Sequence, residues 1–247
     1  MTGEVGCILV AAGSGTRLGA DRPKAFVPLA GRTLLEHAMA RVAGSGVLGP
    51  LVVVVPPALV VQAGELDGVR AARTLLGGNL VVVPGGSDRT GSVRRGLAAL
   101  PPDVGSVLVH DAARCLVPPE LVRRVSEALA FFAAVVPGLP PADTVKQVDA
   151  AGDVVATPDR STLRLVQTPQ GFDRTLLEHA HRAADAAGGG SAATDDAALV
   201  ERLGQPVHVV PGDPRALKVT TPDDLAYAGW LLAADRAASS LPEVQAT

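Results

Sequence analysis

The chain has 247 residues, of which 47% are hydrophobic but only 2% aromatic, and its formal net charge is −3. This length suits one large α/β domain or two small ones. The charge, the scarcity of aromatic residues and the lack of a basic cluster argue against nucleic-acid binding. No apolar run is long enough to span a membrane, and the N-terminus lacks a signal-peptide pattern. We therefore expect a cytoplasmic protein in which Cys7 and Cys115 are reduced thiols.

Strand-like and helix-like segments alternate along the first half of the chain. The predicted strands cover residues 5–10, 51–55, 80–83, 107–110 and 133–136, and the predicted helices cover 33–42, 92–100 and 118–129. Ser92 is the expected N-cap of the second helix. This alternation favours a mostly parallel sheet in one domain, residues 1–235. We expect residues 236–247 to form a disordered tail.

The first predicted strand leads into a loop of small residues followed by two cations. The loop and its cations are Ala11, Ala12, Gly13, Ser14, Gly15, Arg17 and Lys24. Small residues let backbone N–H groups approach an anion, and the cations add fixed charge. A Walker A ending is absent, and Leu18 stands where a dinucleotide fingerprint needs its third Gly. By itself the loop fits either phosphate binding or an ordinary Gly-rich turn.

Two further strand ends carry polar or Gly-rich segments. They contribute Gly85, Gly86 and Ser92 after the third predicted strand, and His110, Asp111, Ala112, Ala113 and Arg114 after the fourth. Because parallel strands end at one edge of a sheet, we expect all three strand ends to border a single crevice. There Asp111 suits a Mg²⁺ ligand, the alternative being a carboxylate that caps the next turn.

Two neighbours of Asp111 are harder to interpret. His110 should point away from Asp111, because side chains alternate along a strand, so a structural role is favoured over that of a general base. The sequence also offers no nucleophilic side chain that this histidine would activate. For Arg114, phosphate binding and pairing with Asp111 both remain open.

A predicted β-hairpin, with strands at 144–148 and 153–157, interrupts the alternating pattern. An isolated hairpin is only marginally stable. We therefore expect this arm, residues 139–170, to lean on a partner subunit of a homodimer, the alternative being that it folds back on its own domain. Within it, Arg160 is by default a surface charge paired with Asp159.

The C-terminal third contains a predicted helix at 195–203, edge strands at 207–210 and 216–219, and a final helix at 222–232. Lys218 lies in the second of these strands. A lysine there is usually solvated, although a strand bordering the crevice could direct it inward.

The order of these motifs closely resembles the 2-C-methyl-D-erythritol 4-phosphate cytidylyltransferases of the non-mevalonate isoprenoid pathway. The resemblance extends from about residue 5 to residue 232. The matching segments are 11–17, 23–24, 85–92, 110–114, 143–146, 159–160, 167–170, 194–196 and 218–220. It implies a single Rossmann-like nucleotidyltransferase domain with a mostly parallel sheet and a protruding β-hairpin arm.

The resemblance also implies the reaction and the residues that carry it. CMP would pass from CTP to 2-C-methyl-D-erythritol 4-phosphate, and pyrophosphate would leave. Arg17 and Lys24 would stabilise the α-phosphate, while Arg160 and Lys218 would position the acceptor phosphate. The nucleotide would be held by Ala11, Ala12, Gly13, Ser14, Gly15, Gly85, Gly86, Ser92, Asp111 and Ala112. Asp111 would hold Mg²⁺, Thr144 would lie near the acceptor, and exchanged arms would bring Arg160 to the neighbouring site of a homodimer.

The expected chemistry agrees with the absence of a candidate general base. A phosphate monoester is largely dianionic at neutral pH and is already a nucleophile. The enzyme must then position two anions and stabilise developing charge. Two alternatives remain: a cytidylyltransferase for another polyol phosphate, such as ribitol 5-phosphate, and a non-catalytic nucleotide-binding module. An NAD-dependent oxidoreductase is disfavoured by Leu18.

Overall fold

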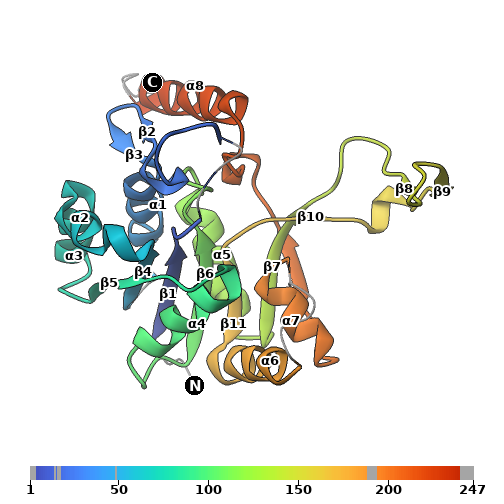
Figure 1. Cartoon of the computed structure of the whole chain (residues 1–247), viewed down its shortest axis with the longest axis horizontal. Coiled ribbons are helices and arrows are strands. Elements are labelled where there is room, and N and C mark those ends of the chain that lie inside the picture. Colours follow the sequence, from blue (N-terminus) through green and yellow to red (C-terminus); the bar gives the residue numbers. More distant parts are fainter. Residues whose placement is uncertain (1–3, 14, 16–17, 48, 188–193, 240–247) are drawn as a thin grey trace, which may run out of the picture.

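The computed structural model describes residues 4–13, 15, 18–47, 49–187 and 194–239. Within these ranges the centre of the fold is a mixed eight-stranded sheet (Figure 1). Its strands are β1 (Val5–Val10), β4 (Leu51–Val55), β5 (Leu80–Pro84), β6 (Ser106–Asp111), β7 (Ala134–Leu139), β10 (Leu165–Val166), β11 (Gln170–Asp173) and β12 (His208–Pro211). The strand order is β10-β7-β11-β6-β1-β4-β5, and β12 pairs with β7. A small separate hairpin joins β2 (Pro28–Leu29) to β3 (Arg32–Thr33).

Helices cover both faces of the sheet. They are α1 (Leu34–Ala43), α2 (Val60–Glu65), α3 (Asp67–Leu75), α4 (Arg89–Ala99), α5 (Pro119–Ala128), α6 (Arg174–Ala186), α7 (Asp196–Arg202) and α8 (Pro222–Ser239). Alternation along β1 divides the core, because Cys7 and Leu9 pack with α1 and α5, whereas Ile8 packs with α4 and α6. Cys7 and Cys115 are both buried and free of disulfides, as expected. The predicted α/β fold is confirmed.

Parallel pairing dominates around β1, and antiparallel pairing enters on one side of it. β1 pairs in parallel with β4 and β6, β4 with β5, and β12 with β7. β11 lies between β6 and β7 and is antiparallel to both. A Cβ atom at Gly171 of β11 would lie 2.9 Å from Val125 Cγ1, so glycine permits the close approach of α5. β10, β11 and α6 were not predicted from the sequence.

Local capping fixes where α1 and α4 begin. Thr33 and Glu36 form a capping box at the start of α1. The predicted N-cap of α4 is wrong, because the helix begins earlier and Asp88 Oδ1 accepts a 2.7 Å hydrogen bond from the Gly91 amide. Ser92 Oγ instead accepts from the Gly86 amide at 3.1 Å and donates to the Asp88 carbonyl at 2.8 Å. Ser92 therefore connects the loop after β5 to the first turn of α4.

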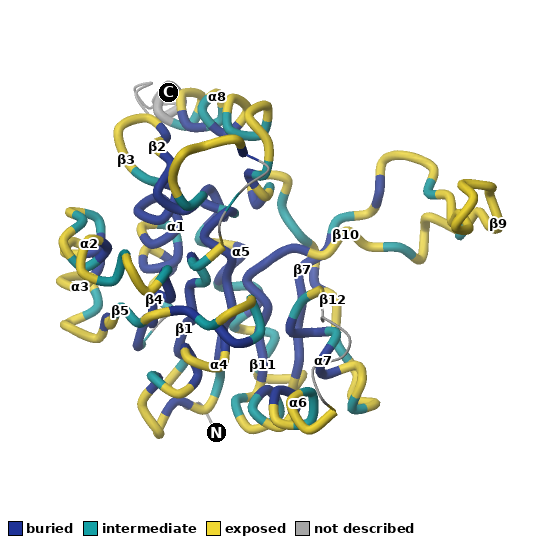
Figure 2. Tube along the Cα trace, viewed as in Figure 1, coloured by how far each residue is buried: buried dark blue, intermediate teal, exposed yellow. Residues whose placement is uncertain are grey.

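The predicted hairpin forms an arm that projects from the body of the molecule (Figure 1). Its strands, β8 (Gln147–Val148) and β9 (Val154–Ala156), are antiparallel but shorter than expected. In the loop between them, the Asp149 carboxylate accepts hydrogen bonds from the amides of Ala151 and Asp153, at 2.9 and 3.0 Å. Figure 2 shows the arm mostly as exposed or intermediate, in contrast to the buried central strands.

The C-terminal third departs from the sequence-based expectation in two places. The predicted strand at 216–219 is wrong, because Asp213 caps a 3₁₀ turn, Pro214–Ala216, where strand pairing was expected to begin. Beyond this turn, Val219 N donates to Ala113 O at 2.8 Å without forming part of a ladder.

The final helix, α8, runs past its predicted end at Leu232 and reaches Ser239. The remainder of the predicted disordered tail, 240–247, lies outside the described residues. On α8 the rings of Tyr227 and Trp230 stack at 5.8 Å, and these residues are 50% and 62% exposed. In the described part of the chain, no helix is long and apolar enough to cross a membrane.

Candidate active site

A pocket of about 490 Å³ lies at the carboxyl ends of β1, β5 and β6. The three strand ends that the sequence analysis assigned to one crevice therefore meet in the structure. The predicted site residues that line the pocket are Ala11, Ala12, Gly13, Gly15, Lys24, Gly86, Ser92, Asp111, Ala112 and Lys218. Two other predicted residues, Ser14 and Arg17, lie outside the described residues.

Glycines allow the loops around this pocket to approach one another. A Cβ atom at Gly85 would lie 2.5 Å from Ala12 Cβ and 3.0 Å from Ser92 Oγ, so the loops after β1 and β5 touch at this glycine. Gly15 has φ +71°, and a Cβ atom there would lie 3.0 Å from Lys24 N. These two contacts place the first loop between the second loop and Lys24.

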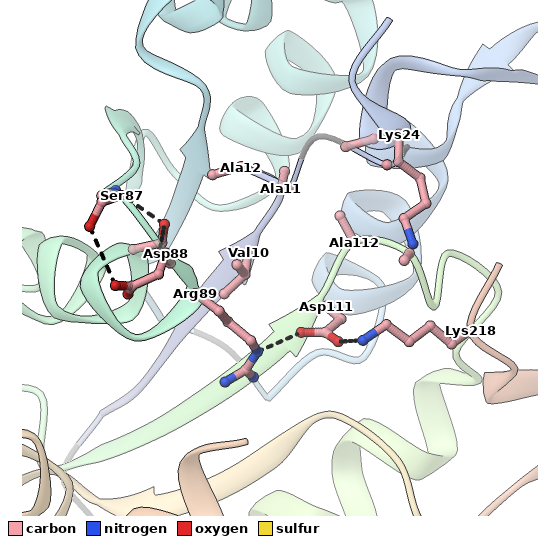
Figure 3. A pocket seen from close by; sticks show the side chains of 16 residues that line it. Val10, Ala11, Ala12, Lys24, Ser87, Asp88, Arg89, Asp111, Ala112 and Lys218 are labelled. Atoms are coloured by element: carbon pink, nitrogen blue, oxygen red, sulfur yellow. Dashed lines mark hydrogen bonds and ion pairs between the residues drawn. The ribbon is translucent and has the colours of Figure 1, made fainter. Parts of the chain in front are cut away.

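Asp111, the last residue of β6, lies between two cations (Figure 3). Its Oδ1 is 3.3 Å from Arg89 Nε, and its Oδ2 is 2.7 Å from Lys218 Nζ. Burial opposes ionisation of Asp111, but the charges of Arg89 and Lys218 outweigh it and hold its pKa well below the ordinary value. Both carboxylate oxygens form ion pairs, which favours a role in the pocket over the alternative of a turn cap.

Arg89 is a pocket residue that the sequence analysis missed. Besides Asp111, it contacts Asp196 at the start of α7, with 2.7 Å between Nη1 and Oδ2. Burial would lower the pKa of Arg89, but the two carboxylates raise it above its ordinary value. The sequence places Arg89 in the segment after the third predicted strand, and nothing local in the sequence indicates its partner on α7.

His110 is fully buried beside Asp111 and belongs to a chain of hydrogen bonds. Thr168 Oγ1 accepts from the Asp111 amide at 3.1 Å and lies 2.9 Å from His110 Nδ1. His110 Nε2 lies 3.3 Å from the Arg114 carbonyl, so a neutral ring with its hydrogen on Nε2 satisfies both contacts. Burial lowers the pKa of His110 to about 4. This environment supports the structural role that strand alternation favours.

The side chain of Arg114 binds two backbone carbonyl groups. It donates to Ala216 O at 2.7 Å and to Val166 O at 3.2 Å. These contacts join the end of β6 to β10 and to the segment that precedes Lys218. The structure thus gives Arg114 a third role, different from the phosphate contact and the Asp111 ion pair that the sequence left open.

Two predicted acceptor-binding residues lie on the arm, and neither lines the pocket of the same chain. Thr144 and Arg160 are exposed, and Arg160 donates to the Ala142 carbonyl at 2.9 Å. The expected pairing of Arg160 with Asp159 is not what the contacts show, because Asp159 caps a 3₁₀ turn by accepting from the Ser161 amide at 2.9 Å.

The pocket's donor set bears on the metal that the sequence predicts. Among the described residues, no three His, Cys, Asp or Glu side chains are grouped so as to hold a metal ion. Asp111 is nevertheless an ionised carboxylate in the wall of the pocket. Mg²⁺ needs only one or two protein carboxylates when substrate phosphates and water complete its shell. The residues present therefore fit a nucleotide-dependent magnesium site.

Comparison with known proteins identifies the family. The family model for 2-C-methyl-D-erythritol 4-phosphate cytidylyltransferase matches residues 5–234. The chain belongs to this family. It is thus a cytidylyltransferase of isoprenoid biosynthesis, and the predicted family and enzyme class are confirmed.

Several relatives and solved structures of the family resemble the chain over most of its length. A 2-C-methyl-D-erythritol 4-phosphate cytidylyltransferase of Rhodococcus opacus is 51% identical over 93% of this chain and 96% of its own. One from Nocardia farcinica is 52% identical over 93% and 94%. The crystal structure of the Thermus thermophilus enzyme superposes with a TM-score of 0.73 at 38% identity and covers 94% of this chain and 98% of its own.

Proposed function

We propose that the pocket binds CTP and transfers CMP to the phosphate of 2-C-methyl-D-erythritol 4-phosphate, with release of pyrophosphate. Membership of the family supports this pair of substrates. The observation that carries the proposal is that Lys24, Asp111 and Lys218, from three separate parts of the chain, line one pocket with the Gly-rich loops. This arrangement suits the positioning of anions, which is the main task when the nucleophile is already a phosphate dianion.

Within this pocket we assign the cations to two groups. Lys24 and Arg17, at the loop after β1, would stabilise charge on the α-phosphate and the leaving pyrophosphate. Lys218 would bind the acceptor phosphate. Since Lys218 Nζ pairs with Asp111 in this structure, acceptor binding requires Lys218 to shift its contact from the carboxylate to the phosphate. Gly86, on the second loop, and Ser92, in the first turn of α4, would hold the nucleoside part of CTP.

Asp111 is our candidate ligand for Mg²⁺. Each of its oxygens makes one ion pair, and an ionised carboxylate has about four lone-pair positions in all, so acceptor capacity remains. When bound, Mg²⁺ would reduce the negative charge on the triphosphate. The protein's own part is to keep Asp111 ionised, which Arg89 and Lys218 do through their charges.

We further propose a homodimer in which each arm reaches the pocket of the other subunit. The arm carries exposed apolar side chains, including Val148, Val154 and Val155, each more than half exposed in the single chain. Such a segment gains stability when a second surface covers it. In the dimer Thr144 and Arg160 would complete the acceptor site.

The two free cysteines agree with a reducing compartment such as the cytoplasm.

The reaction can be tested by measuring pyrophosphate release from the purified protein with CTP and each candidate acceptor. We expect turnover with 2-C-methyl-D-erythritol 4-phosphate and its loss when EDTA removes divalent cations. The variant Lys24→Ala should lower kcat by about 10²–10³-fold, as removal of one stabilising group in a charge-developing transition state does. Faster turnover with ribitol 5-phosphate would overturn the choice of acceptor, and pyrophosphate release at the wild-type rate by Lys24→Ala would overturn the mechanism.

A matched control removes a cation elsewhere. Arg70 on α3 is exposed, pairs with Glu65 and does not line the pocket. Arg70→Ala should keep wild-type kinetics. Acceptor-dependent pyrophosphate release also separates an enzyme from a non-catalytic nucleotide-binding module, which would bind CTP without turnover.

A further inference from the structure

Asp111 forms ion pairs with two cations that differ in burial and in their number of partners. Arg89 is about three-quarters buried and bridges Asp111 and Asp196, whereas the side chain of Lys218 is 42% exposed. Figure 3 shows Arg89 and Lys218 reaching the carboxylate from opposite sides. The two cations share one anion, so a change at either of them alters how strongly the carboxylate attracts the other.

Asp196, which pairs with Arg89, makes buried contacts with residues that do not line the pocket. Asp196 is 1% exposed, and its Oδ1 lies 3.1 Å from Nε2 of His181, which is itself 2% exposed. Gln170 of β11 donates to the Asp195 carboxylate at 2.7 Å and accepts from the Ala197 amide at 3.2 Å. Asp196 thus lies between two residues that are tied to the central sheet, which makes it a firm support for the Arg89 guanidinium.

Removal of Arg89 would change the surroundings of Lys218. Asp111 is 11% exposed on its side chain, and a nearly buried carboxylate is strongly destabilised when it loses a charged partner. With Arg89 gone, Lys218 would be the remaining cation within ion-pair distance of Asp111 among the described residues. The Asp111 carboxylate would then hold Lys218 more tightly, and the acceptor phosphate would compete less well for the Lys218 ammonium group.

We propose that Arg89, supported by Asp196, is a positioning residue that keeps Asp111 paired and thereby leaves Lys218 available to the acceptor phosphate. The inference rests on the role proposed above for Lys218. It assigns Arg89 no contact with either substrate. Its effect should therefore appear in the use of the acceptor and should depend on the presence of Lys218.

The test is a double-mutant cycle with steady-state kinetics in both substrates. Arg89→Gln should raise KM for 2-C-methyl-D-erythritol 4-phosphate by about 10- to 100-fold, the size of effect seen when a residue that orients a metal ligand is lost. At saturating Mg²⁺, where a changed metal affinity of Asp111 has no effect on the rate, KM for CTP should change much less. Arg89→Lys, which keeps a cation beside Asp111, should recover part of the loss. In a Lys218→Ala background, Arg89→Gln should add little.

Asp196→Asn provides a second variant that retains Arg89 and removes only the charge of its support. It should raise KM for the acceptor in the same direction. Asp185→Asn is the matched control, because Asp185 also pairs with an arginine of α4, Arg94, but at an exposed position away from the pocket. Thermal unfolding of every variant shows whether it is folded at the assay temperature.

The outcomes separate this inference from the proposed function. If Lys218→Ala raises KM for the acceptor but Arg89→Gln and Asp196→Asn match the Asp185→Asn control, the inference is wrong and the proposed function stands. If Arg89→Gln weakens both substrates equally, or adds its full effect in the Lys218→Ala background, Arg89 does not act through Lys218. If Lys218→Ala leaves KM for the acceptor unchanged, the proposed role of Lys218 is wrong, and the inference that rests on it is wrong as well.

Discussion

His110 and Asp111 are consecutive residues of β6 with opposite electrostatic surroundings. Asp111 faces Arg89 and Lys218 and stays ionised, whereas His110 is enclosed and neutral because burial lowers its pKa to about 4. Thr168 contacts both, through the Asp111 amide and His110 Nδ1. The charge at this strand end therefore comes from the carboxylate, and the histidine supports the backbone that carries it.

Replacement of His110 should flatten the pH dependence of stability. Folding lowers the pKa of His110 from 6.5 to about 4, so between these values the unfolded chain binds a proton that the folded chain does not. Stability is then full above about pH 6.5 and falls as the pH drops towards 4, by roughly 3 kcal/mol from this group. Urea unfolding at pH 7.5 and 4.5 should show a smaller difference for His110→Asn than for the wild type.

A control is needed because other histidines remain in both proteins. Burial also lowers the pKa of His37, which contributes in the same direction to wild type and variant alike. His179→Asn replaces an exposed histidine of α6 and serves as the matched substitution. Equal pH dependence in His110→Asn and His179→Asn would contradict the prediction.

At the scale of single residues, strand ends and the family resemblance predict several pocket residues. They do not predict pairs of residues that only the fold brings together. Lys24, Asp111 and Ala112 follow from strand ends and the family resemblance, and all three line the pocket. Arg89 and Asp196 are 107 residues apart, and no local spacing relates them. Such a pair is evident only once α4 and α7 are placed on the same face of the sheet.

At the scale of elements, α4 links Arg89 in the pocket to the core. It begins at Arg89 and packs on β1, β4 and β5. Close packing depends on Gly96, because a Cβ atom there would lie 2.5 Å from Ile8 Cγ2 in the buried core. The position of Arg89 relative to Asp111 thus depends on the distance between α4 and β1.

Gly96→Ala should destabilise the protein by about 1–3 kcal/mol, since an added methyl group in a closely packed core displaces its neighbours. Gly64→Ala is the matched control on α2, where an added Cβ meets no atom within 4 Å. There alanine should stabilise the helix by up to about 1 kcal/mol. Chemical denaturation gives both values, and a Gly96→Ala protein as stable as Gly64→Ala would show that α4 can move away from β1 without cost.

The elements found from sequence are those with a single clear pattern. Apolar runs predicted β1, β4 and β6, because buried parallel strands are apolar on both faces. The run of β5 is apolar as well, although this strand lies at the edge of the sheet and Val81 is 46% exposed. β11 was missed because its four residues, Gln170–Asp173, mix polar, small and aromatic side chains. The wrongly predicted strand at 216–219 has strand-like composition, but the turn at Pro214–Ala216 and the hydrogen bond from Val219 to Ala113 set its path.

For the molecule as a whole, the arm and the pocket belong to different regions of one chain. The arm leaves the sheet after β7 and returns through β10, and its tip extends away from the body (Figure 1). Thr144 and Arg160 lie on this arm, while Lys24 and Lys218 line the pocket. A complete acceptor site of the kind we propose therefore needs a second copy of the chain.

Mixing two inactive variants tests whether the arms are exchanged. Lys24→Ala damages the pocket and Arg160→Ala damages the arm, so a mixed dimer with exchanged arms contains one intact site. Random mixing should restore about a quarter of wild-type activity, because half of the dimers are mixed and each has one intact site of two. Activity of the mixture that stays at the average of the separate variants, with dimers verified by sedimentation, would show that each arm serves its own subunit.

The stacked pair of Tyr227 and Trp230 on α8 determines which spectroscopic signal can follow unfolding of the protein. Trp230 is the only tryptophan of the chain and Tyr227 the only tyrosine, and both are at least half exposed. Indole emission from the folded protein is therefore already close to that of a solvated ring, and unfolding will shift it little. Fluorescence will report on the surface of α8, whereas loss of the sheet and its helices must be followed by far-ultraviolet circular dichroism.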